Sequence, residues 1–175
     1  MESPELARFE AVVLPHLDAA YTLARHLMRN ANDAEDAVQE ACLRALTYFD
    51  GFHGAHEQSA RAWLLAIVRN TVYTWRRRAR ADALATEFDE RTHSEAIADE
   101  HPEATLLRTA AKEVVGRAVD RLPPEFREVI VLREFQGLSY KEISDVAGVP
   151  VGTVMSRLAR ARTRLQEALR DEEAP

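Results

Sequence analysis

The stretch from residue 151 to residue 169 predicts a helix with two chemically different sides. Apolar residues recur at helical spacing along one side: Val154, Leu158, Ala161 and Leu165. The opposite side is polar, and its first members, Thr153, Ser156 and Arg157, could reach base edges in a DNA major groove, because arginine pairs naturally with guanine O6 and N7. Farther along come arginines suited to phosphates, which set affinity and register: Arg160, Arg162 and Arg164.

The residues before this helix predict the scaffold of a helix-turn-helix motif. Ser139 and Glu142 have the spacing of a capping box that starts a short helix, and Gly148 supplies a tight turn before the longer one. Val149 would fill the angle between the two helices. An arginine-rich face alone is more often simply solvated. The capping box, the turn glycine and the divided helix together favour DNA binding.

A second basic cluster lies in the helix predicted over residues 60–80. Its last part, residues 69–80, contains five arginines and no acid. One face carries Arg69, Tyr73, Arg76 and Arg80, with Asn70 and Arg77 beside it. Basic residues interleaved with an aromatic suit single-stranded DNA, because the cations follow the phosphates and the ring can stack on an exposed base. The two tryptophans of this helix, Trp63 and Trp75, are predicted to pack in the core.

A third patterned surface, on the helix predicted to begin at an Asn32–Glu35 capping pair, is acidic. The helix has an apolar stripe made of Val38, Ala41, Cys42, Ala45 and Phe49, so Cys42 is predicted to be a buried packing residue. The face away from the stripe carries Asp33, Asp36, Gln39, Glu40 and Arg44. Such a face is commonly only solvated, but on a rigid helix it can also pair with a basic partner.

The elements that must position these surfaces are helices, since no strand-like alternation or internal repeat occurs along the chain. We predict an all-α protein with two small helical domains, residues 1–81 and 106–175, joined by a flexible acidic linker, residues 82–105. The linker carries eight acids and one base, whereas the first domain is neutral and the second has a net charge of +1. The overall charge of −6 therefore does not argue against nucleic-acid binding.

Composition excludes several classes of protein. The 175 residues are 46% hydrophobic and 30% charged, as in globular proteins, and no apolar run approaches the ~20 residues that span a bilayer. The first residues lack the features of a signal peptide, so we expect a cytoplasmic protein without membrane insertion. One cysteine and scattered histidines predict no metal site and no cofactor. The chain shows no nucleophile–base set or phosphate loop, which argues against an enzyme with a small-molecule substrate.

The C-terminal residues resemble region 4 of the sigma-70 family. The resemblance lies in an ordered string: Leu122-Pro123-Pro124, Arg127-Glu128-Val129, Leu132-Arg133, Gly137-Leu138-Ser139-Tyr140, Glu142-Ile143, Val149-Pro150-Val151-Gly152-Thr153-Val154 and Ser156-Arg157-Leu158-Ala159-Arg160-Ala161-Arg162. Many unrelated regulators share a helix-turn-helix, but this string is far more specific. By resemblance, the helix after Gly152 would read the −35 element of a promoter.

The N-terminal residues resemble region 2 of the same family. Residues 33–40 are similar to region 2.2, which implies docking on RNA polymerase through Asp33, Asp36, Gln39 and Glu40. Residues 61–80 resemble regions 2.3 and 2.4, which implies capture of the melted −10 strand, with residues 50–59 as the loop for a flipped base. Many relatives carry an acid near Thr74, and this chain does not. The length points to the minimal extracytoplasmic-function (ECF) group.

The resemblance implies that the protein recruits RNA polymerase to promoters and does not itself catalyse a reaction. It implies three partners: bacterial core RNA polymerase, promoter DNA and an anti-sigma factor. Tethering on one polymerase would let two weak DNA-binding modules act together. One alternative is a stand-alone helix-turn-helix regulator, which predicts a ligand pocket or dimer seam in residues 1–80 and duplex binding without polymerase. A structural interaction protein is a further alternative, but it would not need the arginine-rich face after Gly152.

Overall fold

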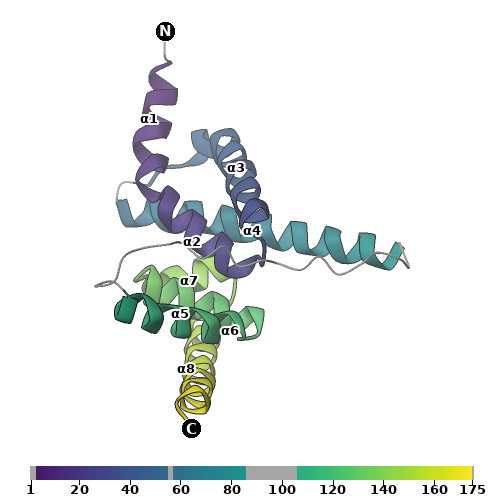
Figure 1. Ribbon diagram of the computed structural model, residues 1–175. Coiled ribbons are helices and arrows are strands. Elements are labelled where there is room, and N and C mark those ends of the chain that lie inside the picture. The colour runs from purple at the N-terminus through teal and green to yellow at the C-terminus, as the bar shows by residue number, and fades with distance from the viewer. Residues whose placement is uncertain (1–2, 55–56, 86–105, 175) are drawn as a thin grey trace.

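Helices make up almost all of the part of the chain that the computed structural model describes, namely residues 3–54, 57–85 and 106–174 (Figure 1). No strand occurs in these ranges, which confirms the all-α prediction. The elements of the N-terminal domain are α1 Pro4–Val13, η1 Leu14–His16, α2 Leu17–Leu27, α3 Ala31–Tyr48, η2 Phe49–Gly51 and α4 Glu57–Ala85. Those of the C-terminal domain are α5 Leu106–Asp120, α6 Pro124–Ile130, η3 Val131–Phe135, α7 Tyr140–Ala147 and α8 Val151–Glu173. None of the described helices is both long enough and apolar enough to cross a membrane.

The N-terminal domain departs from a predicted helix boundary at the start of α3. Before it, the short η1 turn around Pro15 separates α1 from α2, because proline has no backbone N–H and disfavours a helical residue before it. The cap of α3 is Asn30, whose side-chain oxygen accepts hydrogen bonds from the backbone N–H of Asn32 at 2.8 Å and of Asp33 at 3.4 Å. The predicted capping pair that starts at Asn32 is therefore wrong by two residues.

Small residues let α3 pack closely against the rest of the N-terminal domain. Its fully buried positions are four alanines: Ala34, Ala37, Ala41 and Ala45. Cys42 is half-buried beside them, and burial raises the pKa of its thiol, in line with the predicted packing role. At the end of α3, the rings of Phe49, Phe52 and Trp63 pack together, with 4.6 Å between the Phe52 and Trp63 centroids. Trp63 is partly buried and packs against the core, in line with its predicted packing role.

Helix α4 is longer than predicted and crosses the molecule. It begins at Glu57 and ends at Ala85, and residues 77–85 are exposed along the part that projects beyond the other helices (Figure 1). Residues 82–85, which the sequence interpretation assigned to the linker, belong to this helix. The rest of the predicted linker, residues 86–105, lies outside the described residues.

The C-terminal domain contains the predicted helix-turn-helix. Ser139 caps α7 with a complete capping box: its hydroxyl accepts from the Glu142 N–H at 3.1 Å, and the Glu142 carboxylate accepts from the Ser139 N–H at 2.7 Å. Gly148 ends α7 with a φ of +67°, a left-handed conformation that glycine adopts without the steric penalty of a Cβ. Helix α8 follows directly and buries Val154, Leu158 and Ala161 against the domain.

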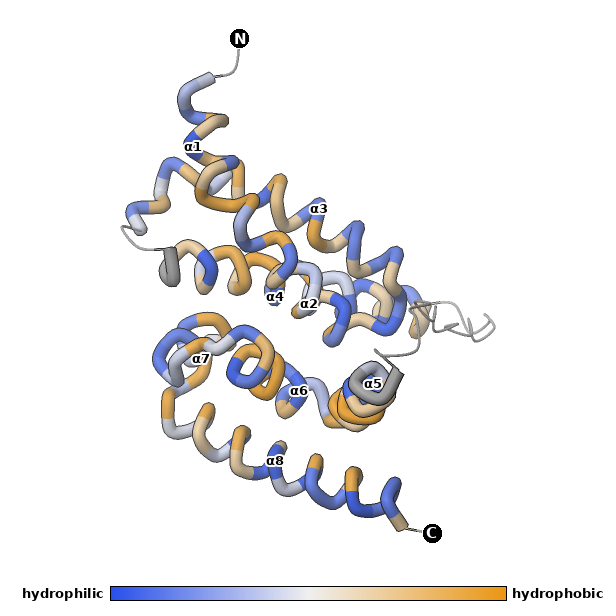
Figure 2. Tube along the Cα trace, turned by 60° about the vertical axis from the view of Figure 1, so that its left-hand side comes forward, coloured by the Kyte–Doolittle hydropathy of each residue, from blue (hydrophilic) through white to orange (hydrophobic). Residues whose placement is uncertain are grey.

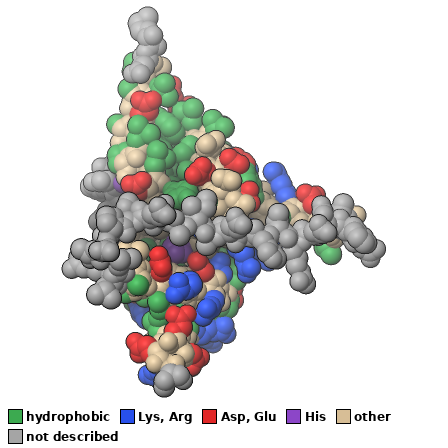
Figure 3. Space-filling view, viewed as in Figure 1, with side chains coloured by type: hydrophobic (Ala, Val, Ile, Leu, Met, Phe, Trp, Pro, Cys, Tyr) green, Lys and Arg blue, Asp and Glu red, His purple; other side chains and the backbone are tan. Residues whose placement is uncertain are grey.

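The two domains lie against each other. Helices α2 and α4 contact α6 and α7, and residues of η3 also touch α2. Figure 2 shows α8 on the outer side of the C-terminal domain, with α6 and α7 between it and the N-terminal helices. On the face seen in Figure 3, hydrophobic side chains gather over the N-terminal helices and many Lys and Arg side chains over the C-terminal part. This packing decides which of the predicted surfaces is open.

Candidate nucleic-acid and polymerase interfaces

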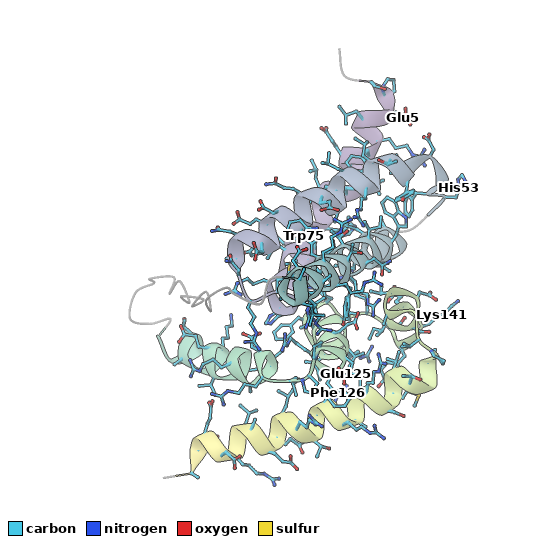
Figure 4. All side chains as sticks on the ribbon, turned by 90° about the vertical axis from the view of Figure 1, so that its right-hand side faces the viewer. Glu5, His53, Trp75, Glu125, Phe126 and Lys141 are labelled. Carbon is cyan, nitrogen blue, oxygen red and sulfur yellow. The ribbon has the colours of Figure 1, made fainter. Side chains whose placement is uncertain are left out.

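The first part of α8 forms one wall of a shallow, open hollow of about 380 Å³. Its lining residues are Glu125, Phe126, Gly152, Thr153, Ser156, Arg157 and Arg160. Glu125 and Phe126 come from the start of α6 and lie beside α8 (Figure 4). Ser156 and Arg160 are exposed, while Thr153 and Arg157 are half-buried at the wall. Four of the six predicted −35 residues therefore share one accessible polar surface.

The two remaining arginines of the predicted −35 set lie apart from each other. The guanidinium of Arg164 lies 4.9 Å from the centroid of the Phe126 ring, so this arginine continues the wall of the hollow. Arg162 lies on another side of α8, where its Nη2 donates to Glu134 Oε1 at 2.9 Å. Helical spacing grouped Arg162 with the arginines predicted to contact phosphates, because it carries no information about this acidic neighbour from η3.

The predicted −10 surface on α4 is divided between buried and exposed residues. Arg69, Tyr73 and Arg76 are half-buried, and both guanidinium groups lie over the Tyr73 ring, at 4.3 Å for Arg69 and 5.8 Å for Arg76. The other predicted residues, Asn70, Arg77 and Arg80, are exposed. The predicted loop for a flipped base is described only in part, and the ring of its Phe52 is buried against Trp63.

A carboxylate of the C-terminal domain covers the half-buried part of this surface. Glu128 of α6 is fully buried, and it forms an ion pair with Arg69 through the guanidinium Nε. Its Oε2 also accepts from Arg69 Nη2 at 3.5 Å and from the Tyr73 hydroxyl at 3.2 Å. Burial and the negative charge of Glu128 raise the pKa of Tyr73 to about 12. Burial by itself would lower the pKa of Arg69, but the hydrogen bond and charge of Glu128 outweigh it and raise the pKa.

The acidic surface of α3 is largely as predicted. Asp33, Asp36 and Gln39 are exposed. The expectation that Glu40 is equally exposed is wrong: this side chain is half-buried, and its carboxylate accepts a hydrogen bond from the Trp75 indole at 2.6 Å and pairs with Arg44. Trp75 lies on α4 close to α3 (Figure 4), so Glu40 connects the two helices.

Two exposed leucines were missed by the sequence interpretation. Leu43 is 66% exposed and Leu46 is 43% exposed, both on α3. Their positions do not follow the helical spacing of the buried alanines, so the two leucines lie on the exposed side of α3. This difference in spacing could have identified them from the sequence. Large apolar side chains exposed beside polar ones often mark a protein–protein contact. They enlarge the surface that begins at Asp33.

Both halves of the chain match models of a known family. The model described as Sigma-70 region 2 matches residues 12–81, and the model described as Sigma-70, region 4 matches residues 112–165. The RNA polymerase sigma-H factor of Pseudomonas aeruginosa is 36% identical over 169 residues, which cover 92% of this chain and 86% of that protein. The ECF RNA polymerase sigma-E factor of Escherichia coli (strain K12) is 36% identical over 138 residues, which cover 75% of this chain and 71% of that protein.

A solved structure agrees with this assignment. The sigma factor RpoE of Bartonella quintana, in complex with the anti-sigma factor NepR, superposes with a TM-score of 0.74. The two sequences are 28% identical, and the similarity covers 93% of this chain and 97% of the other. The order of the helices, the helix-turn-helix and the matches to both regions agree with one another. The chain belongs to the sigma-70 family of RNA polymerase sigma factors, in its extracytoplasmic-function group.

Proposed function

We propose that this sigma factor starts promoter-specific transcription by bringing three separate surfaces to one polymerase–promoter complex. The observation that carries the proposal is the hollow at the start of α8, where Ser156, Arg157 and Arg160 stand on a helix held rigidly by its buried side. A recognition helix needs this combination of a fixed apolar side and an accessible polar side. Arg157 is the residue for base contact, and Arg160 and Arg164 are the residues for phosphates.

Polymerase docking is assigned to the exposed face of α3. Asp33 and Asp36 supply negative charge, Gln39 supplies an amide, and Leu43 adds apolar area beside them. Charges of this kind speed the encounter with a basic partner, while a desolvated apolar contact supplies more of the affinity. Glu40 has a different part: bound to Trp75, it holds α3 at a fixed position on α4. Docking and strand capture would then be geometrically coupled.

Capture of the opened −10 strand is assigned to α4. Arginines at positions 69, 76, 77 and 80 would follow the phosphates, and Tyr73 offers a ring for stacking, with Asn70 beside it. Two weak DNA contacts gain affinity when one polymerase holds both. The proposed action needs no catalytic group, and we place it in the cytoplasm. Since RpoE of Bartonella quintana was solved with the anti-sigma factor NepR, we propose an anti-sigma factor as a partner here too.

The experiment that tests the proposal is transcription in vitro with purified bacterial core polymerase on a pool of genomic promoter fragments. We expect new transcripts only when this protein is added. The double variant Asp33→Lys/Asp36→Lys should abolish them and lower the affinity for core polymerase. A matched control is Glu113→Lys, which changes an exposed acid on α5 and should leave transcription intact.

Two outcomes would contradict the proposed function. If the protein binds duplex operators alone but starts no transcription with core polymerase at any promoter, it acts as a stand-alone helix-turn-helix regulator. Equal loss of transcription in Asp33→Lys/Asp36→Lys and in Glu113→Lys would remove the docking role from α3.

A further inference from the structure

Helix α8 carries an apolar stripe on its exposed side, made of Val151, Met155 and Ala159. Met155 is 53% exposed and Val151 is 39% exposed, and Ala159 is exposed as well. Among residues 109–174, no large hydrophobic side chain is more exposed than that of Met155. The three residues are four positions apart, so they lie on one side of the helix, away from its buried side. The packing of the described residues therefore leaves this stripe uncovered.

Gly152 is a second feature of the same side of α8, next to the stripe. A Cβ added to this residue would meet no atom within 4 Å, so packing inside the described part of the protein does not require a glycine there. Its backbone is helical, and it is not one of the glycines with positive φ. A glycine without such an internal reason permits the close approach of a ligand to the backbone. The surface around Met155 is thus open to a large ligand.

The charge around the stripe indicates what kind of ligand fits. Residues 150–166 contain four arginines and no acid. The exposed Ser156 and Arg160 border the stripe and also line the hollow at the start of α8. One turn farther on, Arg162 is paired with Glu134, and the stripe ends before this pair. A protein partner usually covers about 20–30 residues a side, far more than three side chains supply. An anionic ligand that also presents small apolar groups fits the surface better.

We infer that Met155 contacts the C5-methyl group of a thymine in the major groove and sets a preference for thymine in the −35 element. Duplex DNA offers phosphates to the arginines, and thymine presents a methyl group in the major groove. Val151 and Ala159 extend the apolar contact along the groove, and Gly152 lets the helix approach closely. The inference rests on the proposed function of α8 and adds a base that its polar residues do not read.

The test is transcription in vitro by the full chain with core polymerase, on a barcoded promoter library whose −35 region is randomised. The library is built on the most active promoter of the genomic pool. With the wild type we expect enrichment of thymine in the −35 region, and Met155→Ala should lose it at one position at least. Met155→Leu keeps a large apolar side chain and should retain it. Val115→Ala is the control, because Val115 lies on α5 and is 39% exposed, as Val151 is. It should leave every base preference unchanged.

A second arm removes the methyl group from the DNA instead of changing the protein. Deoxyuridine replaces the thymine at the position found with the library and differs from it only in lacking the C5-methyl group. Burial of one such group corresponds to about fourfold in affinity. At limiting holoenzyme, the wild type should therefore make about fourfold less transcript from the deoxyuridine template. Met155→Ala should transcribe the two templates equally.

Three results would overturn the inference while leaving sigma function intact. The first is equal sensitivity of the wild type and Met155→Ala to deoxyuridine. The second is a wild type that is indifferent to the methyl group at every thymine of the −35 region. The third is a Met155→Ala protein that binds core polymerase more weakly but keeps the wild-type base preference, since the stripe would then contact protein. If the wild type starts transcription at no promoter, the proposed function itself fails, and the inference fails with it.

Discussion

Replacing Gly148 by alanine tests how the turn of the helix-turn-helix is held. Gly148 has a φ of +67° and donates its N–H to the Ser144 carbonyl at 2.9 Å. A Cβ at this position would meet no atom within 4 Å. Steric crowding by neighbours therefore plays no part, and the cost of the alanine comes from its backbone conformation alone.

Two opposing contributions set the change in the free energy of unfolding of Gly148→Ala. A left-handed backbone destabilises an L-residue by about 1–2 kcal/mol. The alanine also restricts the unfolded chain, which offsets about 0.4–1 kcal/mol. We expect Gly148→Ala to lower the free energy of unfolding by about 1 kcal/mol. Gly116, in the middle of α5, also has nothing within 4 Å of an added Cβ, but it is helical. Gly116→Ala should therefore stabilise the same domain by about 0.5–1 kcal/mol.

The assay is urea unfolding of the full chain, followed by circular dichroism. The two variants make the same chemical change and restrict the unfolded chain alike, so their difference isolates the native backbone conformation. We expect the two urea midpoints to move in opposite directions from that of the wild type. Converted with a common slope, the free energies of unfolding of the two variants should differ by about 1.5–2 kcal/mol. If Gly148→Ala is as stable as Gly116→Ala, the left-handed turn does not constrain residue 148, and the reasoning fails.

Three further predictions concern the functional surfaces. Arg157→Ala should remove about 1–3 kcal/mol of −35 discrimination in promoter competition, whereas Arg162→Ala, paired with Glu134, should leave it unchanged. The pKa of Tyr73 is raised from 10.0 to about 12, because the folded protein favours the neutral phenol. The contribution of Tyr73 to the free energy of unfolding is therefore fully present below pH 10 and is lost as the pH rises toward 12. Urea midpoints measured across this range should show the loss in the wild type and not in Tyr73→Phe. Trp75→Phe leaves Glu40 without its indole donor and should lower the urea unfolding free energy by about 1–3 kcal/mol, more than Glu40→Gln does.

Local patterns predicted the elements well where the signal is chemical and short-range. The Ser139–Glu142 box, the Gly148 turn and the apolar step from Val154 to Leu158 all act within a few residues, and all appear as expected. The cap of α3 was misplaced because Asn30 and Asn32 both resemble caps. Only the backbone conformation of residue 30, extended with φ −108° and ψ 126°, distinguishes them.

The sequence by itself determined the helices, their buried faces, the helix-turn-helix and the three polar surfaces, because each depends on periodicity and capping along a single element. It could not show that Glu128 would neutralise Arg69, that Glu40 would bind Trp75, or that Arg162 would pair with Glu134. These pairs join residues 59, 35 and 28 positions apart. Helical periodicity carries no information across such separations. Only the tertiary packing brought the charges together, and it decided which predicted surface is open and which is covered.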